Sequence, residues 1–210
     1  MKRLFVMLMA VTMFLPAMNA QNKQLEKQIK KEVKQKLKEL KKGGYEIFGS
    51  SRTLETALNK HYTTLETEGE KVLEVVGFST AKSHNLAAAA AMNSAANRYA
   101  TASSTQVKGR MLSDMASDVA NHEAEFDKFY AAYEGKVEQE IRGELRPSFS
   151  VKKDNPDGTI SVQSFFIVNE DAASRARIKA FQNSQAESAA AQQYAQRVSD
   201  FVNERVVPED

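Results

Sequence analysis

The chain of 210 residues contains no cysteine. This absence excludes a disulfide-bonded scaffold, a thiolate metal site, a cysteine nucleophile and a lipidated N-terminal cysteine. The nine glycines are scattered, and the pair Gly43-Gly44 ends a helical pattern instead of opening one, so we expect no glycine-rich phosphate loop. No apolar run after residue 20 is long enough to cross a bilayer as a helix.

An excess of charge of one sign is lacking as well. The chain carries 29 basic and 27 acidic residues, and Lys2 and Arg3 account for the difference. From residue 21 onward, 27 basic residues face 27 acidic residues, so this part is formally neutral. Neutrality argues against a strongly basic nucleic-acid-binding protein and against an acidic disordered tail. We therefore expect no nucleic-acid partner.

Residues 1–20 have the pattern of a secretory signal peptide. Lys2 and Arg3 form a charged start, and an apolar run follows from Leu4 to Leu15, which is too short for a membrane-spanning helix. Small residues then precede Gln21, and cleavage before Gln21 fits the pattern best. The pattern predicts a periplasmic or secreted protein, and the alternative is an uncleaved membrane anchor.

Residues 21–43 have the pattern of a basic amphipathic helix. Between residues 22 and 42 the sequence holds nine lysines and three glutamates, a local charge of +6, so the rest of the neutral chain carries −6. The apolar residues recur at spacings of three and four and form one narrow stripe: Leu25, Ile29, Val33, Leu37 and Leu40. Two interpretations stay open. Either the stripe packs on the chain's own domain and the lysines are solvated, or the helix is attracted to anionic lipid headgroups or to an acidic partner.

Residues 44–182 predict one α+β core domain. We expect a short, mainly antiparallel sheet of about four strands, covered by long helices on one face. Its clearest element is a hairpin in which Leu145 to Lys153 and Thr159 to Asn169 flank the turn Asn155-Pro156-Asp157-Gly158. The second hairpin strand is aromatic and β-branched, which is typical of a central strand. The other expected elements are strands at residues 45–48 and 71–80 and helices that end at about Glu68, Thr101 and Arg142.

Residues 183–210 predict a helical C-terminal extension. A last helix opens at Asp171 and reaches about Val206, but its middle, from Gln182 to Gln193, is mostly glutamine, serine and alanine. This dilution of the apolar side weakens a coiled-coil interpretation and indicates an exposed or frayed stretch. We therefore expect the N- and C-terminal helices to be extensions of the core domain.

The three histidines are the first candidates for chemistry. His122-Glu123-Ala124-Glu125-Phe126 begins like a zinc-protease helix, but phenylalanine stands where the second histidine is needed. His61 and His122 fall near apolar helix faces, which favours buried histidines over ligands, and His84 has no metal-ligand spacing to either of them. No serine-nucleophile motif is present. We predict no catalytic, cofactor-binding or metal-ligating residue.

Three segments together resemble a known family. They follow the export signal and read KELKKGGYEIF, VVGFSTAKSHNLAAAAAMNSAANRYA and SVQSFFIVNEDAASRARIKAF. The combination resembles the small envelope lipoprotein-like family of Gram-negative bacteria and is similar to the N-terminal domain of T-type flagellar outer-membrane assembly proteins. In that pattern a strand, a glycine and an alanine-rich helix follow one another, and the corresponding places are occupied by Gly77, Ala87, Ala91, Ala95 and Arg98. The resemblance covers about residues 43–181 and implies a non-catalytic envelope role, although the cysteine for the family's lipid anchor is missing.

The sequence therefore favours a non-catalytic, exported cell-envelope protein that serves as an interaction or assembly module. The expected partner is an envelope protein or a second copy of the chain, with peripheral contact between the lysine-rich helix and an anionic membrane as a third option. The alternative is a periplasmic hydrolase or ligand-binding enzyme whose site is assembled in space. That alternative requires a pocket in which a histidine lies at hydrogen-bond distance from a serine, aspartate or glutamate.

Overall fold

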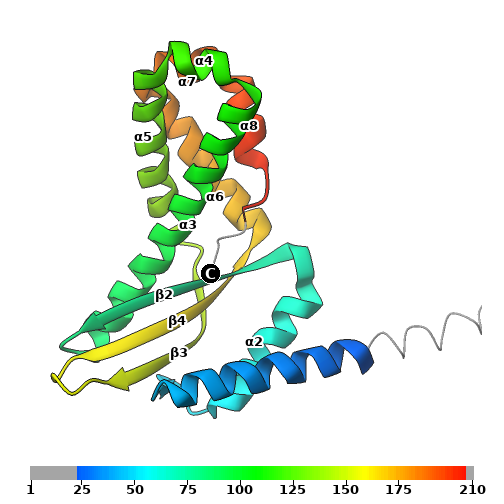
Figure 1. The fold of residues 1–210 in the computed structure, drawn as a ribbon, viewed down its shortest axis with the longest axis vertical. Helices are drawn as coiled ribbons and strands as arrows, with labels where there is room; N and C mark the ends of the chain where they lie inside the picture. The colour runs from blue at the N-terminus through cyan, green and yellow to red at the C-terminus, as the bar shows by residue number, and fades with distance from the viewer. Residues whose placement is uncertain (1–22, 207–210) are drawn as a thin grey trace, which may run out of the picture.

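The computed structural model describes residues 23–206, so the predicted signal peptide lies outside the described residues (Figure 1). Residues 23–42 are helical and are called the N-terminal helix below. The elements that follow it are, in chain order, β1 (Glu46–Phe48), α2 (Leu54–Glu68), the 3₁₀ turn η1 (Gly69–Lys71), β2 (Val72–Ala81), α3 (His84–Asp114), α4 (Ala116–Asn121), α5 (Glu123–Arg142), β3 (Arg146–Asp154), β4 (Ile160–Asn169), α6 (Glu170–Ser184), the 3₁₀ turn η2 (Gln185–Glu187), α7 (Ala189–Gln193) and α8 (Ala195–Asn203).

The four strands form one antiparallel sheet in the order β1-β3-β4-β2, which confirms the predicted α+β class. The predicted hairpin is β3 and β4, and β4 is a central strand, as its aromatic and β-branched sequence indicated. At the hairpin turn Gly158 has a φ of 77°, a left-handed conformation that glycine adopts without a steric cost. The Asn155 N–H donates to the Thr159 carbonyl at 2.8 Å and closes the turn.

Helices cover both faces of the sheet, whereas the sequence indicated one. On one face α3 packs against Val162 through its buried alanines. On the other face the N-terminal helix and α2 pack against Phe149, Val151 and Phe165. Strand β4 explains the difference, because Phe165 belongs to the cluster under the N-terminal helix while the adjacent Phe166 belongs to the cluster under α3. Successive side chains of a strand point to opposite faces, so β4 is apolar on both.

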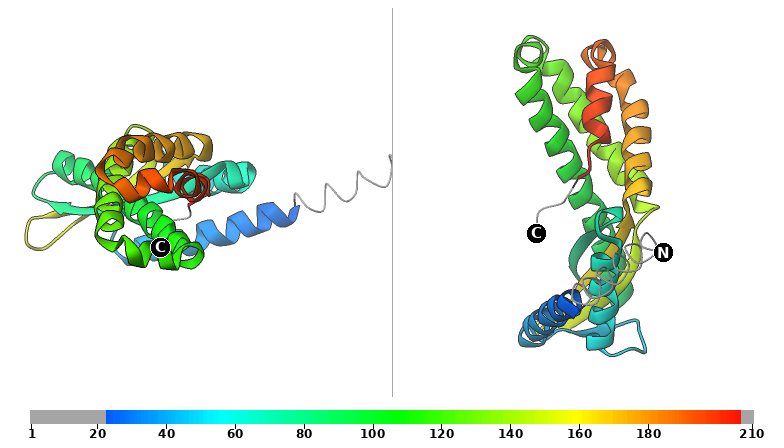
Figure 2. Two further views of the ribbon diagram at one scale, coloured as in Figure 1. Left: turned by 90° about the horizontal axis from the view of Figure 1, so that it is seen from above. Right: turned by 90° about the vertical axis from the view of Figure 1, so that its right-hand side faces the viewer.

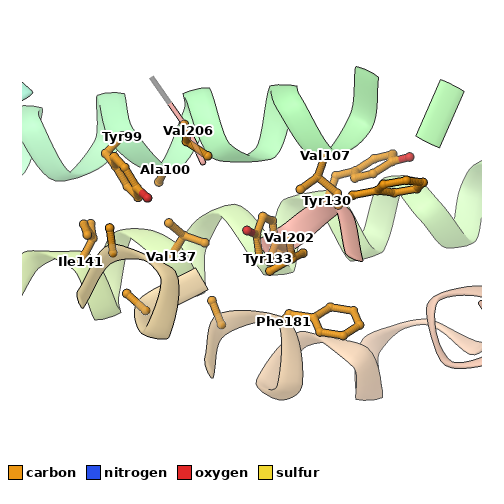
Figure 3. Packing of buried hydrophobic residues seen from close by; sticks show 14 of the residues in the cluster. Tyr99, Ala100, Val107, Tyr130, Tyr133, Val137, Ile141, Phe181, Val202 and Val206 are labelled. Atoms are coloured by element: carbon orange, nitrogen blue, oxygen red, sulfur yellow. The ribbon is translucent and has the colours of Figure 1, made fainter. Parts of the chain in front are cut away.

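The second half of the molecule is a helical bundle. The 31-residue helix α3 continues beyond the sheet and packs there against α5 and α8, and α6 packs in turn against α5 and α8 (Figures 1 and 2). Aromatic and aliphatic side chains of these helices fill the space between them, as Figure 3 shows for Tyr99, Val107, Tyr133, Ile141 and Phe181. The bundle and the N-terminal helix lie at opposite ends of the elongated molecule.

The described part of the predicted C-terminal extension shares this core. Six of its buried side chains belong to the same hydrophobic cluster as α3, α5 and α6: Ala190, Ala191, Val198, Phe201, Val202 and Val206. The glutamine-, serine- and alanine-rich stretch at residues 182–193 is therefore exposed only in part. Small side chains such as Ser188 and Ala190 are buried because they allow the helices to approach closely, while most of the other residues stay exposed. Two predicted long helices are also interrupted. Residues 113–142 break at Met115 and His122, where φ is −139° and −132°, and the last helix breaks at Ser188 and Tyr194.

Candidate functional site

The N-terminal helix is attached to the sheet through its apolar stripe. Ile29, Val33 and Leu40 are only 8%, 4% and 2% exposed, and they pack against the buried leucines of α2 and against Phe149 and Phe165 of the sheet. Leu25 and Leu37 pack at the edges of the same cluster. The apolar stripe is thus buried inside the molecule, and it attaches the N-terminal helix to α2 and the sheet.

Eight lysines of this helix form one continuous exposed surface, which we call the lysine face. Its members are Lys23, Lys27, Lys30, Lys31, Lys34, Lys38, Lys41 and Lys42. At 100° per residue these positions fall within about one third of the helix circumference, because an α-helix has 3.6 residues per turn. The three glutamates of the helix lie outside that sector: Glu32 and Glu39 on the opposite flank, and Glu26 next to the apolar stripe, about 40° from Lys30. No acid therefore lies within the lysine face. The composition of residues 21–43 predicted the net charge of the helix. That the lysines lie on one side of it becomes clear only when their positions are placed around the helix axis.

Within residues 23–206 the lysine face has no carboxylate partner at salt-bridge distance. No described carboxylate lies within 4.0 Å of any of its eight ammonium groups. The ninth lysine, Lys36, lies apart from the face, where it pairs with Glu39 at 3.1 Å and approaches the Phe165 ring. Acidic residues of the bundle are paired locally instead, as Glu140 is with Lys179 at 2.7 Å. Packing therefore holds the helix in place, and its positive charge is left facing solvent.

A row of polar residues on α2 borders the lysine face. Open grooves between the N-terminal helix and α2 share Lys30 and Asn59 in their walls. On the α2 side they are lined further by Glu55, Thr63 and Thr67, and on the side of the N-terminal helix Glu26 is the one acid among the lining residues. The residues on the α2 side recur every fourth position, so they form one stripe of that helix. The grooves contain no histidine, and they lead from the lysine face toward the apolar stripe without a buried polar group at the bottom.

His61 of α2 makes the closest histidine–carboxylate contact in the described structure. Its Nε2 lies 2.7 Å from Oε1 of Glu74 on β2, and its ring is fully buried among the rings of Tyr62, Phe149 and Phe165. Nδ1 of the same ring has no hydrogen-bond partner. This contact ties α2 to the edge strand of the sheet. It includes no hydroxyl nucleophile, and the ring borders none of the grooves described above.

The other two histidines are not brought together with it. His84 is the first residue of α3, stacks on Phe48 at 5.4 Å and has its Nε2 3.9 Å from Asp154. His122 lies at the junction of α4 and α5, where its Nδ1 lies 3.0 Å from the Asp118 carbonyl. His122 is the N-cap residue of α5, which begins at Glu123. The segment His122–Phe126, which begins like a zinc-protease helix, therefore has its histidine before the first helical residue. Among residues 23–206 no group of three or more histidine, aspartate or glutamate side chains could hold a metal ion.

One buried charged group was not found from the sequence. Arg177 of α6 is fully buried, and its guanidinium donates to the hydroxyl of Tyr99, to Glu170 at 2.9 Å and to the Val202 carbonyl at 2.9 Å. Burial lowers the pKa of Arg177, but Tyr99 and Glu170 outweigh that effect and raise it, so the group stays charged. Burial raises the pKa of Tyr99 to about 12 despite the neighbouring guanidinium. The network joins α3, α6 and α8, and we interpret it as structural.

The residues behind the family resemblance meet at one place. Gly77 of β2 lies directly against the backbone of α3 at Ala91 and Ala95. Ala87 is buried in the same contact, and Arg98 lies over the ring of Phe78 at 5.4 Å. The small residues therefore serve a close approach between strand and helix, which is a packing role.

Within residues 23–206, none of the helices combines the length and the apolar character that a bilayer span requires. No protein-family model, curated protein or solved structure matches the chain, so the resemblance to the envelope lipoprotein-like family stays a prediction.

Proposed function

We propose that this chain is a non-catalytic, exported cell-envelope protein that acts as an interaction module and contacts an anionic partner through the lysine face. The observation that carries the proposal is the absence of any described carboxylate within 4.0 Å of the eight lysines, on a helix that its buried stripe holds in place. Eight like charges in one sector repel one another, and an anionic partner would relieve that repulsion. The predicted export signal supports the envelope as the location.

The enzymatic alternative rests on the contact between His61 and Glu74. A histidine–carboxylate pair is one component of many hydrolytic sites, where the second ring nitrogen must reach a nucleophile or a water. Here the ring is fully buried and that second nitrogen has no partner. A substrate would have to displace α2 to reach it. The lysine face, in contrast, is exposed, and we therefore prefer the interaction module.

A charge-neutralised variant tests the proposal in the producing cell. The lysine-face variant carries Lys27→Gln, Lys31→Gln and Lys38→Gln, all at exposed positions. The control variant carries Lys71→Gln, Lys82→Gln and Lys128→Gln, which remove the same charge from exposed positions elsewhere. The fraction of the protein that sediments with the cell envelope is measured for both variants and for the unchanged chain.

We expect the lysine-face variant to leave the envelope fraction and the control variant to stay in it. High salt should release the unchanged chain, because screening weakens contacts between exposed charges. Equal sedimentation of the two variants would contradict the proposal, since the contact would then not depend on the lysine face.

A further inference from the structure

We propose that the anionic partner is the surface of a lipid bilayer, which the lysine face contacts through headgroup phosphates without insertion. This inference rests on the proposed function and names the partner for the same surface. It is carried by the chemistry of the lysine face, by the burial of the apolar stripe and by the position of the N-terminal helix in the molecule.

The residue types on the helix favour a diffuse anionic surface. All nine basic residues between positions 23 and 42 are lysines, and this segment contains neither arginine nor an aromatic residue. Arginine provides the planar, bidentate fork with which proteins recognise individual carboxylates and phosphates, and aromatic rings stack on nucleic-acid bases. Lysine ammonium groups are mobile point charges. A row of them suits many equivalent headgroups better than one shaped acidic site on a protein.

The apolar stripe excludes the usual mode of an amphipathic membrane helix. Such a helix buries its apolar face among the acyl chains, but here Ile29, Val33 and Leu40 are already buried against the protein. Contact with a bilayer is then purely electrostatic. The helix is about 30 Å long, because each residue adds 1.5 Å, and lysines occur from one end to the other, so several headgroups are contacted at once.

The position of the helix determines how the molecule would stand on the membrane. The N-terminal helix crosses the end of the molecule opposite the bundle, and its axis runs across the long axis of the bundle (Figures 1 and 2). Because α4 lies at the other end of the molecule, we expect a bilayer in contact with the N-terminal helix to lie far from α4. The exposed side chain of Leu112, close to that end, is then available to the surrounding compartment.

Vesicle binding tests the inference with defined lipids. The exported form of the chain is mixed with neutral phosphatidylcholine vesicles or with vesicles that also contain phosphatidylglycerol, at about 20 mM and about 500 mM salt. We expect binding to the anionic vesicles at low salt only. Each lysine near such a surface contributes about a fivefold change in affinity, so the lysine-face variant should bind roughly a hundredfold more weakly and the control variant nearly as well as the unchanged chain.

The orientation gives a second, independent readout. Because the chain has no cysteine, a single fluorophore can be attached at Gln35→Cys beside the lysine face or at Ser117→Cys on α4, both exposed. Energy transfer to an acceptor dye in the lipid should be strong from position 35 and weak from position 117. Equal transfer from both positions would overturn the proposed orientation.

The outcomes separate this inference from the proposed function. If the lysine-face variant leaves the cell envelope but the unchanged chain ignores anionic vesicles, the bilayer is the wrong partner and the interaction module stands. A lysine-dependent dimer, measured as mass in analytical ultracentrifugation, would identify a second copy instead and would also overturn the bilayer. If neither assay depends on the lysine face, both proposals fail.

Discussion

Gly77 allows a sharp test of how α3 is seated on the sheet. A Cβ atom at this position would lie 1.8 Å from the carbonyl oxygen of Ala91 and 2.9 Å from the amide nitrogen of Ala95. Both neighbours are backbone atoms of a helix, so no side chain can rotate to make room. Gly77→Ala must push α3 away from the sheet or distort β2. Overpacking of a core commonly costs 1 to 3 kcal/mol, and we expect about 3 kcal/mol or more here because the clash is with backbone.

The matched control is the same substitution where space is open. Gly135 lies inside α5, and a Cβ atom there would meet nothing within 4 Å. Gly135→Ala should raise the free energy of unfolding by about 1 kcal/mol, because alanine has the higher helix propensity. Urea unfolding followed by circular dichroism measures both variants. Equal stability of the two would refute the proposed close contact between β2 and α3.

Three further predictions concern the N-terminal helix and the buried polar network. Leu40→Ala should lower the free energy of unfolding by about 2 to 5 kcal/mol, because Leu40 is buried. The control Lys34→Ala should change it by less than about 0.5 kcal/mol. Equal values for the two variants in urea unfolding would show that the N-terminal helix is not part of the fold. Arg177→Met should cost about 3 to 5 kcal/mol in the same assay, because it leaves the half-buried Glu170 and the buried Tyr99 without their partner. A neutral result would contradict these contacts. The pKa of Tyr99 is about 12 in the folded chain against its ordinary value of 10, so its proton favours the fold. Stability should fall as the pH rises from 10 to 12, and Tyr99→Phe should make that fall shallower; an unchanged slope in urea unfolding at each pH would argue against the raised pKa.

The sequence predicted the sheet better than the arrangement of its helices. The aromatic and β-branched residues of β4 and the turn around Gly158 are local signals, so the two strands of the hairpin could be predicted from short segments. Which faces the helices cover depends on contacts far apart in the chain. The buried stretch around Ala190 shows the limit: alanine and serine give a weak hydrophobic signal, although they pack well where helices approach closely.

The candidate surface was partly predictable for a similar reason. The charge and the apolar stripe of residues 21–43 follow from composition and periodicity, but two interpretations of the helix stayed open. The burial of Val33 favours packing on the chain's own domain, and the same packing leaves the lysine face free for a partner. The network around Arg177 had no sequence signal, because an arginine on an otherwise ordinary helix does not reveal that Tyr99, 78 positions away, lies beside it.

The most direct measurement of the central claim is site-specific photo-cross-linking in intact cells. A photoreactive amino acid at Gln35 lies beside the lysine face without removing a lysine, and one at Ser117 lies at the far end of the molecule, on α4. Mass spectrometry of the products identifies what each position touches. We predict adducts with an anionic envelope component from position 35 that the lysine-face variant loses, and none of these from position 117. The same adducts from both positions, or adducts at position 35 that persist in the lysine-face variant, would contradict the account.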